Sequence, residues 1–350
     1  MNILFLEGDM SRSGGTERMT AWLSGKLCGN HMVHILSLRM AGAEVFYPLA
    51  DSVTHDCLEN EKIHKKINKI HRYIRANQID TVINVDTGMG YIGILAAVGT
   101  KAKVITWEHS NFFNNWGSRW FHVFRKIAAR HSDAMAVLTE RDKKNYETNI
   151  RGCVTVKVLP NPAVRQEAVY DADSKIILSA GLLGKIKRFE LLVPVGKLVF
   201  AKYPDWEWLL CGDGPERESL EKAVHEAGLT ENIIFCGSVK EMEPMYRSAA
   251  MYILTSEMEG LPMVLLEAKS YGLPIVSFDI ETGPSDIVRD GVNGYLVPSG
   301  DTEAMAEKIC RLIEDAELRK RFSENTAIDM GKFDEERILE EWEKLLRECL

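Results

Sequence analysis

The sequence predicts an α/β fold with two parallel-sheet domains in tandem, and three observations predict it. Short apolar segments of strand length alternate with amphipathic segments of helix length along the chain, which is the pattern of β-α-β units. This alternation stops once, at Leu159-Pro160-Asn161-Pro162, and then restarts. The length of 350 residues suits two domains of ordinary size.

The first domain is expected over residues 1–162, because two prolines flanking an asparagine break any regular element. Helical periodicity fills most of the gaps between its strands. The strand candidates lie at 3–6, 31–38, 81–85, 103–107, 134–138 and 154–158.

The second domain is expected over residues 163–330, and residues 331–350 are expected to form a helix that packs back towards the first domain. Strand candidates lie at 176–180, 208–211, 233–235, 251–254 and 274–278, with helices at about 189–201, 216–227, 241–249 and 263–271. The prediction is therefore two Rossmann-like domains facing across a cleft, because ligands of such sheets bind at the carboxyl ends of the strands.

Composition and charge exclude several classes of protein. Apolar residues make up 45% and charged residues 27%, which is ordinary for a globular chain. A net charge of −8 argues against general nucleic-acid binding. Residues 1–165 hold 22 basic and 15 acidic side chains, whereas residues 166–350 hold 21 and 36, so the two halves are expected to face different partners.

The cysteines and the chain start point to a cytoplasmic protein. The seven cysteines are scattered and never spaced C-x-x-C, which fits reduced thiols and excludes a zinc ribbon or a disulfide framework. The first residues lack the pattern of a signal peptide, and no run of about 18 apolar residues occurs. We therefore expect a cytoplasmic location.

Two features of the first domain suggest a ligand. Gly14 and Gly15 lie in a loop between the first strand and a helix, where a ligand can approach backbone amides. The alternative is a tight turn with Thr16 as the helix N-cap. His109 follows the strand at 103–107 and so lies at the ligand-binding edge; the alternative is a structural histidine.

Cations follow the first strand of the second domain. Lys185, Lys187 and Arg188 come after a glycine-bearing loop, an arrangement that suits a diphosphate. A solvated helix start is the alternative, although cations at a helix N-terminus oppose its macrodipole.

The sharpest motif pairs two carboxylates, Glu259 and Glu267, around a helix start. Gly260, Leu261 and Pro262 open the helix, where backbone amides can hold a phosphate. Carboxylates at that position can accept hydrogen bonds from sugar hydroxyls. The alternative makes Glu259 a favourable N-terminal charge and Glu267 a surface residue. A weaker loop at 282–286 follows the next strand.

This run resembles the E-x7-E motif of the family 4 glycosyltransferases, which have the GT-B fold. Residues 210–215 (LCGDGP) resemble the family's G-x-G-P turn, residues 235–237 (FCG) its F-x-G strand end and residues 290–297 (DGVNGYLV) its DGxNGxLV segment. The resemblance covers nearly the whole chain and is strongest over residues 175–300.

The resemblance implies a retaining, metal-independent hexosyltransferase that needs no cofactor and takes its sugar from a nucleotide donor, by default a UDP-sugar. It implies that Lys187 neutralises the leaving diphosphate, that His109 contacts the transferred sugar, and that Glu259 holds the sugar and phosphate. The further donor-binding residues it implies are Gly14, Gly15, Lys185, Arg188, Gly237, Gly260, Leu261, Pro262 and Glu267.

The sequence departs from the family at one place. Where the family has an arginine that grips the diphosphate, this chain has Leu182, and it has Arg188 in place of the following glycine. We hypothesise that Arg188 or Lys185 supplies the missing charge.

The basic first half should carry the acceptor, for which the resemblance implies a polysaccharide or lipid-linked saccharide of bacterial type. Residues 61–75 form a basic amphipathic helix, and residues 112–126 mix aromatic side chains with cations. Both patterns suit peripheral contact with the inner face of the cell membrane. The alternatives are a docked surface helix and core-facing aromatic residues.

Other readings of the whole chain stay open. They are another GT-B enzyme such as a nucleotide-sugar epimerase, a sugar-binding protein without activity, and a non-catalytic transferase-like subunit. The E-x7-E motif argues against the epimerase, and the absence of a signal peptide argues against a periplasmic receptor.

Overall fold

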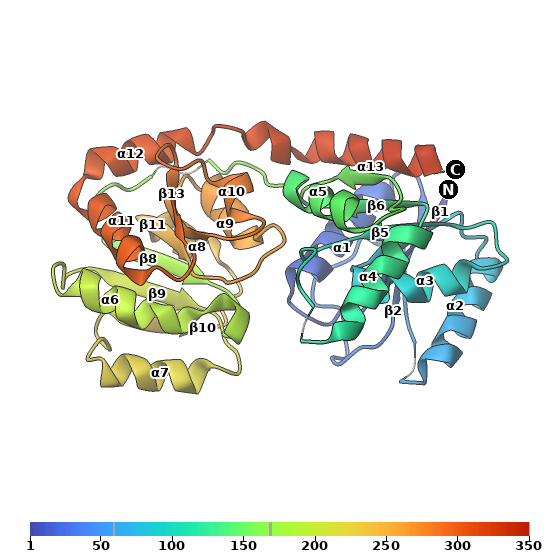
Figure 1. Ribbon diagram of the computed structural model, residues 1–350, viewed down its shortest axis with the longest axis horizontal. Helices are drawn as coiled ribbons and strands as arrows, with labels where there is room; N and C mark the ends of the chain where they lie inside the picture. The colour runs from blue at the N-terminus through green and yellow to red at the C-terminus, as the bar shows by residue number, and fades with distance from the viewer. Residues whose placement is uncertain (59, 116, 168–169, 350) are drawn as a thin grey trace. The chain divides into compact units, whose positions relative to one another are not determined.

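The computed structural model describes residues 1–58, 60–115, 117–167 and 170–349. The chain divides into two compact units: unit 1 comprises Met1–Asn161 with Glu336–Leu350, and unit 2 comprises Pro162–Glu335. Each unit has one parallel β-sheet with helices on both faces (Figure 1), so the predicted α/β fold with two parallel sheets is confirmed.

Unit 1 contains a seven-stranded sheet in the order β3-β2-β1-β4-β5-β6-β7. Its strands are β1 (Asn2–Glu7), β2 (Met32–Ser37), β3 (Val53–Cys57), β4 (Thr81–Val85), β5 (Lys103–Trp107), β6 (Ala134–Val137) and β7 (Val156–Val158). Its helices are α1 (Gly15–Leu27), α2 (Ile63–Ala76), α3 (Gly90–Ala97), α4 (Arg119–His131) and α5 (Glu140–Asn149), with the short 3-10 helix η1 (Thr87–Met89). The central strands are buried along their length, as apolar strands of a parallel sheet covered on both faces must be.

Unit 2 contains a six-stranded sheet in the order β10-β9-β8-β11-β12-β13. Its strands are β8 (Ile176–Ala180), β9 (Glu207–Cys211), β10 (Ile233–Gly237), β11 (Met251–Leu254), β12 (Ile275–Asp279) and β13 (Gly294–Pro298). Its helices are α6 (Leu192–Phe200), α7 (Arg217–Glu226), α8 (Glu243–Ser248), α9 (Met263–Ser270), α10 (Pro284–Ile287), α11 (Thr302–Glu314) and α12 (Ala316–Asn325). Three 3-10 helices complete the unit: η2 (Lys185–Lys187), η3 (Phe189–Leu191) and η4 (Met330–Phe333).

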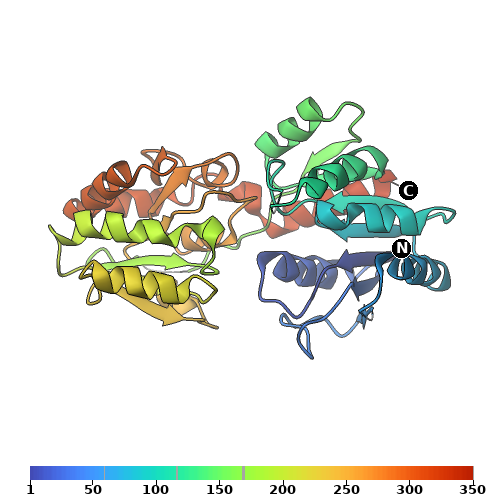
Figure 2. The same ribbon diagram turned by 60° about the horizontal axis from the view of Figure 1, so that its bottom comes forward.

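The last helix, α13 (Glu335–Cys349), packs on unit 1. Trp342 is fully buried, and its ring meets that of Trp107 edge to face at 4.9 Å. The His31 imidazole lies 3.0 Å from the Glu343 carboxylate. These contacts bring the two chain ends together on unit 1 (Figures 1 and 2).

Strand β3 was not predicted from the sequence. It is an edge strand, and its residues Thr54, His55 and Asp56 break the apolar pattern that marks the central strands. Within the described ranges, every helix is too short or too polar to cross a bilayer.

Candidate functional site

The ammonium group of Lys187 lies 2.6 Å from a carboxylate oxygen of Glu259 in unit 2. The two residues follow the neighbouring parallel strands β8 and β11, so both lie at the carboxyl edge of the sheet, where ligands of such sheets bind. Both side chains are only partly buried, at 23% and 12% exposure. A ligand that reaches this edge can therefore contact both charges.

The loops that carry this pair are fastened to each other. The Thr255 hydroxyl donates to the carbonyl of Lys187 at 2.8 Å, and the Glu257 amide donates to the carbonyl of Ile186 at 2.9 Å. On the other side, the Thr282 hydroxyl donates to the carbonyl of Glu259. Backbone contacts of this kind hold the two charged side chains in place without using their own hydrogen-bonding groups.

Helix α9 starts directly after Glu259-Gly260-Leu261-Pro262, with Pro262 as its N-cap. The first amides of a helix have no partner within it, and the helix dipole adds positive potential at this end. A loop with a lysine ammonium group and a helix N-terminus is suited to bind a phosphate and to stabilise negative charge that develops on it.

Glu267 lies on α9 and accepts a hydrogen bond of 2.6 Å from the Tyr246 hydroxyl of α8. The buried Tyr252 of β11 lies within electrostatic reach of both Glu259 and Glu267, and burial together with these carboxylates raises the pKa of its hydroxyl well above the usual value. The two carboxylates therefore flank one buried tyrosine, which itself bonds to the backbone of Ala180.

The loop after β9 needs glycine for close backbone approach. A Cβ on Gly212, whose φ is 147°, would lie 1.9 Å from the carbonyl oxygen of Gly181, and one on Gly214 would lie 2.5 Å from that of Leu183. The Gly212 amide also donates to the carbonyl of Gly237 at 2.7 Å. These contacts bring the predicted donor residue Gly237 and the loop after β8 to the same edge.

The remaining predicted cations do not join the Lys187–Glu259 pair. Arg188 has left-handed backbone angles (φ 50°, ψ 39°), its guanidinium lies 3.7 Å from Glu190, and its Nη atoms lie beside Gly300. Lys185 is exposed and forms no ion pair with any described residue. Leu182 is 64% exposed.

In unit 1, the glycine loop leads into α1, whose N-cap is Gly14. The alternative that made Thr16 the N-cap is wrong, because the helix already starts at Gly15. A Cβ on Gly14 would lie 2.3 Å from the Glu17 carboxylate, which also pairs with Arg12 at 3.7 Å. The buried Glu17 therefore occupies the start of this helix, so the helix favours an uncharged ligand group over an anion.

His109 follows β5 and lies against the Trp107 ring, with a centroid distance of 4.1 Å. Burial lowers the pKa of His109 to about 3, so the imidazole is neutral near pH 7. Its Nε2 atom is buried and has no hydrogen-bond partner among the described residues. A neutral imidazole whose ring nitrogen has no partner can form a hydrogen bond with a ligand hydroxyl group without taking up a second proton.

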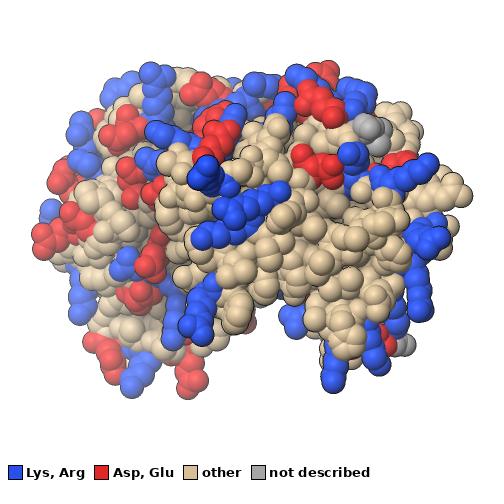
Figure 3. Space-filling view, turned by 45° about the vertical axis from the view of Figure 1, so that its right-hand side comes forward, with Lys and Arg blue, Asp and Glu red and all other residues tan. Residues whose placement is uncertain are grey.

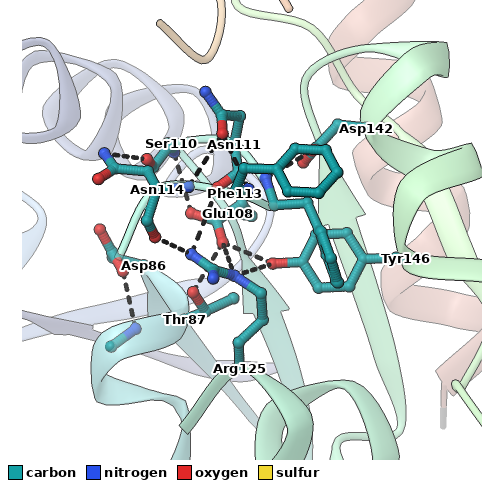
Figure 4. Close-up of polar contacts among 12 residues, drawn as sticks. Asp86, Thr87, Glu108, Ser110, Asn111, Phe113, Asn114, Arg125, Asp142 and Tyr146 are labelled. Atoms are coloured by element: carbon teal, nitrogen blue, oxygen red, sulfur yellow. Dashed lines mark hydrogen bonds and ion pairs between the residues drawn. The ribbon is translucent and has the colours of Figure 1, made fainter. Parts of the chain in front are cut away.

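Figure 4 shows the buried polar network that holds the loop carrying His109. Glu108 accepts hydrogen bonds from the Tyr146 hydroxyl at 2.6 Å, the Thr87 hydroxyl at 2.7 Å and the Ser110 amide at 2.9 Å. The Arg125 guanidinium lies 3.7 Å from Glu108 and also donates to two backbone carbonyls of the loop. Both oxygens of this buried carboxylate are thereby hydrogen-bonded, and its contacts position the loop.

Two further acids of unit 1 lie at the same edge of the sheet. Glu7 ends β1 and is buried; burial, with Glu17 and Asp86 nearby, raises its pKa to about 8. Asp86 follows β4; burial and the neighbouring Glu108 raise its pKa to about 7, against the effects of the Gly88 amide and Arg125. Neither residue was predicted from the sequence, although Glu7 is the last residue of a strand and Asp86 directly follows one.

The two basic segments of unit 1 differ in what they expose. In α2, Ile70 and Ile74 are buried in the core, which supports the docked surface helix, whereas the N-cap Lys62 and the helix residue Lys65 are exposed. Figure 3 shows Lys and Arg side chains at the lower and right-hand edges of this unit.

The segment at 112–126 is mixed. Phe112 is buried, whereas Phe113, Trp120 and Val123 are 52%, 59% and 42% exposed beside the exposed Arg119. Trp116 lies outside the described residues.

The family described as glycosyl transferases group 1 matches residues 161–329 of this chain. An uncharacterized glycosyltransferase of Haemophilus influenzae is 27% identical over 97% of this chain and 98% of the relative. The amylovoran biosynthesis glycosyltransferase AmsD of Erwinia amylovora is 28% identical, over 98% and 99%. A Campylobacter jejuni α-1,4-N-acetyl-D-galactosaminyltransferase, named for a diNAcBac-PP-undecaprenol-linked substrate, is 28% identical over 99% of both chains.

Solved structures agree on the fold. The Anabaena protein HepE in complex with UDP-glucose superposes with a TM-score of 0.84 over 99% of this chain and all of that chain, at 16% sequence identity. This likeness confirms the predicted α/β fold with two parallel sheets.

Proposed function

The chain belongs to the group 1 glycosyltransferases, family 4 with the GT-B fold, and on this premise we propose that it is a retaining, metal-independent enzyme that moves a sugar from a UDP-sugar to a polysaccharide or lipid-linked saccharide. The observation that carries the proposal is the Lys187–Glu259 pair beside the N-terminus of α9. Such a site stabilises charge on a departing diphosphate.

Each donor group has a counterpart in unit 2. Lys187 and the amides of Gly260 and Leu261, which precede the N-cap Pro262, bind the diphosphate, and Glu259 accepts hydrogen bonds from the sugar hydroxyls. Glu267, already oriented by Tyr246, binds the ribose. The choice of uridine rests on the relative whose structure holds UDP-glucose.

Unit 1 supplies the acceptor side. The neutral His109 contacts the transferred sugar, and the loop with Gly14 and Gly15 closes over donor and acceptor. A saccharide acceptor is supported by the relatives named for amylovoran biosynthesis and for an undecaprenol-linked oligosaccharide. Phe113 and Trp120 in residues 112–126 and Lys62 and Lys65 in residues 61–75 are exposed, and they support peripheral contact with the inner face of the membrane.

The test is a panel in the presence of EDTA. Binding of UDP, GDP, ADP and NAD is measured by calorimetry, and the matching nucleotide sugars are then incubated with and without a membrane lipid extract. Tight binding of UDP with metal-free sugar transfer to the extract supports the proposal. Binding of another nucleotide in place of UDP would assign a different class of donor. The absence of both nucleotide binding and sugar transfer would overturn the proposed activity.

A further inference from the structure

Asp86 holds a position in unit 1 that none of the roles above uses. It directly follows β4, which lies between β1 and β5 in the sheet. From β1 the chain runs outwards to β2 and β3 and then returns to β4, so the strand order reverses between β1 and β4. At such a point of an open parallel sheet, the loops on the two sides diverge and leave a ligand-binding crevice.

The loops on the two sides of this point face each other. The thioether of Met89, in the loop after β4, lies 3.7 to 3.8 Å from the position of a Cβ on Gly8. Gly8 begins the loop that leads to Gly14 and Gly15. Asp86 therefore lies beside the glycine loop that is proposed to close over the acceptor.

The backbone of Asp86 is strained. Its φ of 76° and ψ of 138° lie near a region that only glycine adopts readily. Arg188 and Asp329 also have positive φ, but their ψ values of 39° and 10° place them in the left-handed helical region that other residues tolerate better. A strained non-glycine residue at a strand end indicates that its side chain is needed there.

The side chain has unused hydrogen-bonding capacity. One carboxylate oxygen accepts from the Gly88 amide at 2.7 Å, and the other has no hydrogen-bond partner in the part of the chain that the structure describes (Figure 4). At the adjoining strand end, the buried Nε2 of His109 likewise has no partner among those residues. Two polar groups at neighbouring strand ends thus have hydrogen-bonding capacity that no described residue uses.

The charges facing Asp86 come from three elements: Glu7 of β1, Glu108 after β5, and Arg125 of α4. Glu108 is engaged by Tyr146, Thr87 and Arg125. Burial and Glu108 raise the pKa of Asp86 to about 7. A carboxylate that titrates near the working pH can take up a proton and release it again.

We propose that Asp86 binds the attacking hydroxyl of the acceptor and removes its proton. The inference rests on the proposed function. The acceptor oxygen forms a bond to the anomeric carbon on the face from which the diphosphate departs, as retention requires. The bond from that carbon to the β-phosphate oxygen breaks, and the electron pair leaves with the nucleoside diphosphate. The proton of the hydroxyl moves to the free oxygen of Asp86 and from there to water.

The test compares a nucleophile that carries a proton with one that does not. D86N and the wild type are given the nucleotide sugar and the membrane lipid extract that support transfer in the panel above, or the same donor with sodium azide. We expect D86N to lower transfer to the extract by about 100-fold or more, while azide-dependent UDP release stays close to that of the wild type. The wild-type rate should rise through about pH 7, and that rise should be absent in D86N.

Matched variants separate chemistry from folding. D329N makes the same change at another aspartate with positive φ and should leave both rates unchanged. D86G should raise the melting temperature, because it relieves the strain, yet transfer to the extract as poorly as D86N.

The outcomes are distinguishable. Transfer by D86N at the wild-type rate, as expected if the leaving diphosphate takes the proton, overturns the inference. An equal loss with azide and with the extract also overturns it, because the change would then be structural. A wild type that transfers nothing while it binds no UDP contradicts the proposed function instead.

Discussion

The ammonium group of Lys187 lies 2.6 Å from the carboxylate of Glu259, although the two residues are 72 positions apart in the sequence. The site therefore offers one cation and one carboxylate to a nucleotide sugar. The cation can bind the phosphates of the donor, and the carboxylate can accept hydrogen bonds from the hydroxyls of its sugar. Removing Lys187 and removing Glu259 should therefore have different effects on UDP binding.

We expect K187A to weaken UDP binding and to lower turnover by about 100- to 1,000-fold, because the charge that develops on the leaving diphosphate loses its partner. E259A should lower turnover to a similar extent but keep UDP affinity, because UDP lacks the sugar that Glu259 binds. Calorimetry and a transfer assay measure the two effects. K175A, which breaks the exposed Lys175–Asp205 ion pair of the same unit, is the control. Equal losses of UDP affinity in K187A and E259A would contradict the separate roles.

The second cation of the diphosphate site can be identified by its own variants. Arg188 is turned towards Glu190 and Gly300, whereas Lys185 is exposed and has no ion-pair partner among the described residues. If one of them replaces the family's arginine, K185A or R188A should weaken UDP binding by about tenfold, the effect of losing about 1.4 kcal/mol. L182R should strengthen it. Unchanged UDP affinity and turnover in both K185A and R188A would show that neither residue replaces the family's arginine.

The fold was predictable because parallel strands covered on both faces are apolar along their length, and the loops after them follow directly from their ends. Lys187 and Glu259 could be placed at one edge of a sheet on this basis alone. Strand β3 could not be predicted, since an edge strand with His55 and Asp56 lacks that pattern. Thr16 was proposed as a cap because glycine at the N-cap leaves a weaker sequence signal.

Other parts of the site depend on packing that the sequence does not display. The partner of Glu267 is Tyr246, which sits on a different helix. Arg125 reads as one more cation of an amphipathic helix, yet it is 2% exposed and pairs with Glu108. The backbone strain at Asp86 has no sequence signal apart from its position after a strand.

The buried network around Glu108 makes a prediction about stability. R125A should lower the free energy of unfolding by about 3–5 kcal/mol, because it leaves a buried carboxylate without its cation. R130A, on the same helix but exposed, should cost less than about 1 kcal/mol. Urea denaturation measures both. If R125A and R130A unfold at the same urea concentration, Arg125 does not stabilise the buried charge.

If the protein contacts membranes, the segments 61–75 and 112–126 should contribute to binding in different ways. F113S and W120S should reduce sedimentation with phosphatidylglycerol vesicles at all salt concentrations, because they remove exposed apolar surface. K62E and K65E should reduce it mainly at low salt. V98S, at a 65% exposed apolar residue of the same unit, is the control. A wild-type protein that stays in the supernatant at low salt would contradict the membrane contact.

The raised pKa of Glu7 predicts how stability changes with pH. Burial, followed by the nearby Glu17, raises the pKa in the folded chain from 4.5 to about 8, so the folded state holds a proton that the unfolded state has lost between these values. The contribution of Glu7 to the free energy of unfolding should therefore be fully present below about pH 4.5 and should fall as pH rises towards 8. The slope approaches about 1.4 kcal/mol per pH unit.

E7Q mimics the protonated carboxyl group at every pH, so its unfolding free energy should fall less than that of the wild type between pH 5 and pH 9. The difference in unfolding free energy between the two proteins should be on the order of a few kcal/mol at pH 9 and small at pH 5.

Asp9, two residues further along the chain, should change stability with pH in the opposite direction. Burial raises its pKa, but hydrogen bonds from Ser11 and Ala41 outweigh this effect and lower it. D9N should therefore lose stability at pH 7, and this loss should shrink as pH falls below about 4. Denaturant titrations of the wild type, E7Q and D9N across this pH range measure both effects. Parallel curves of unfolding free energy against pH for E7Q and the wild type would mean that Glu7 is charged in the folded protein.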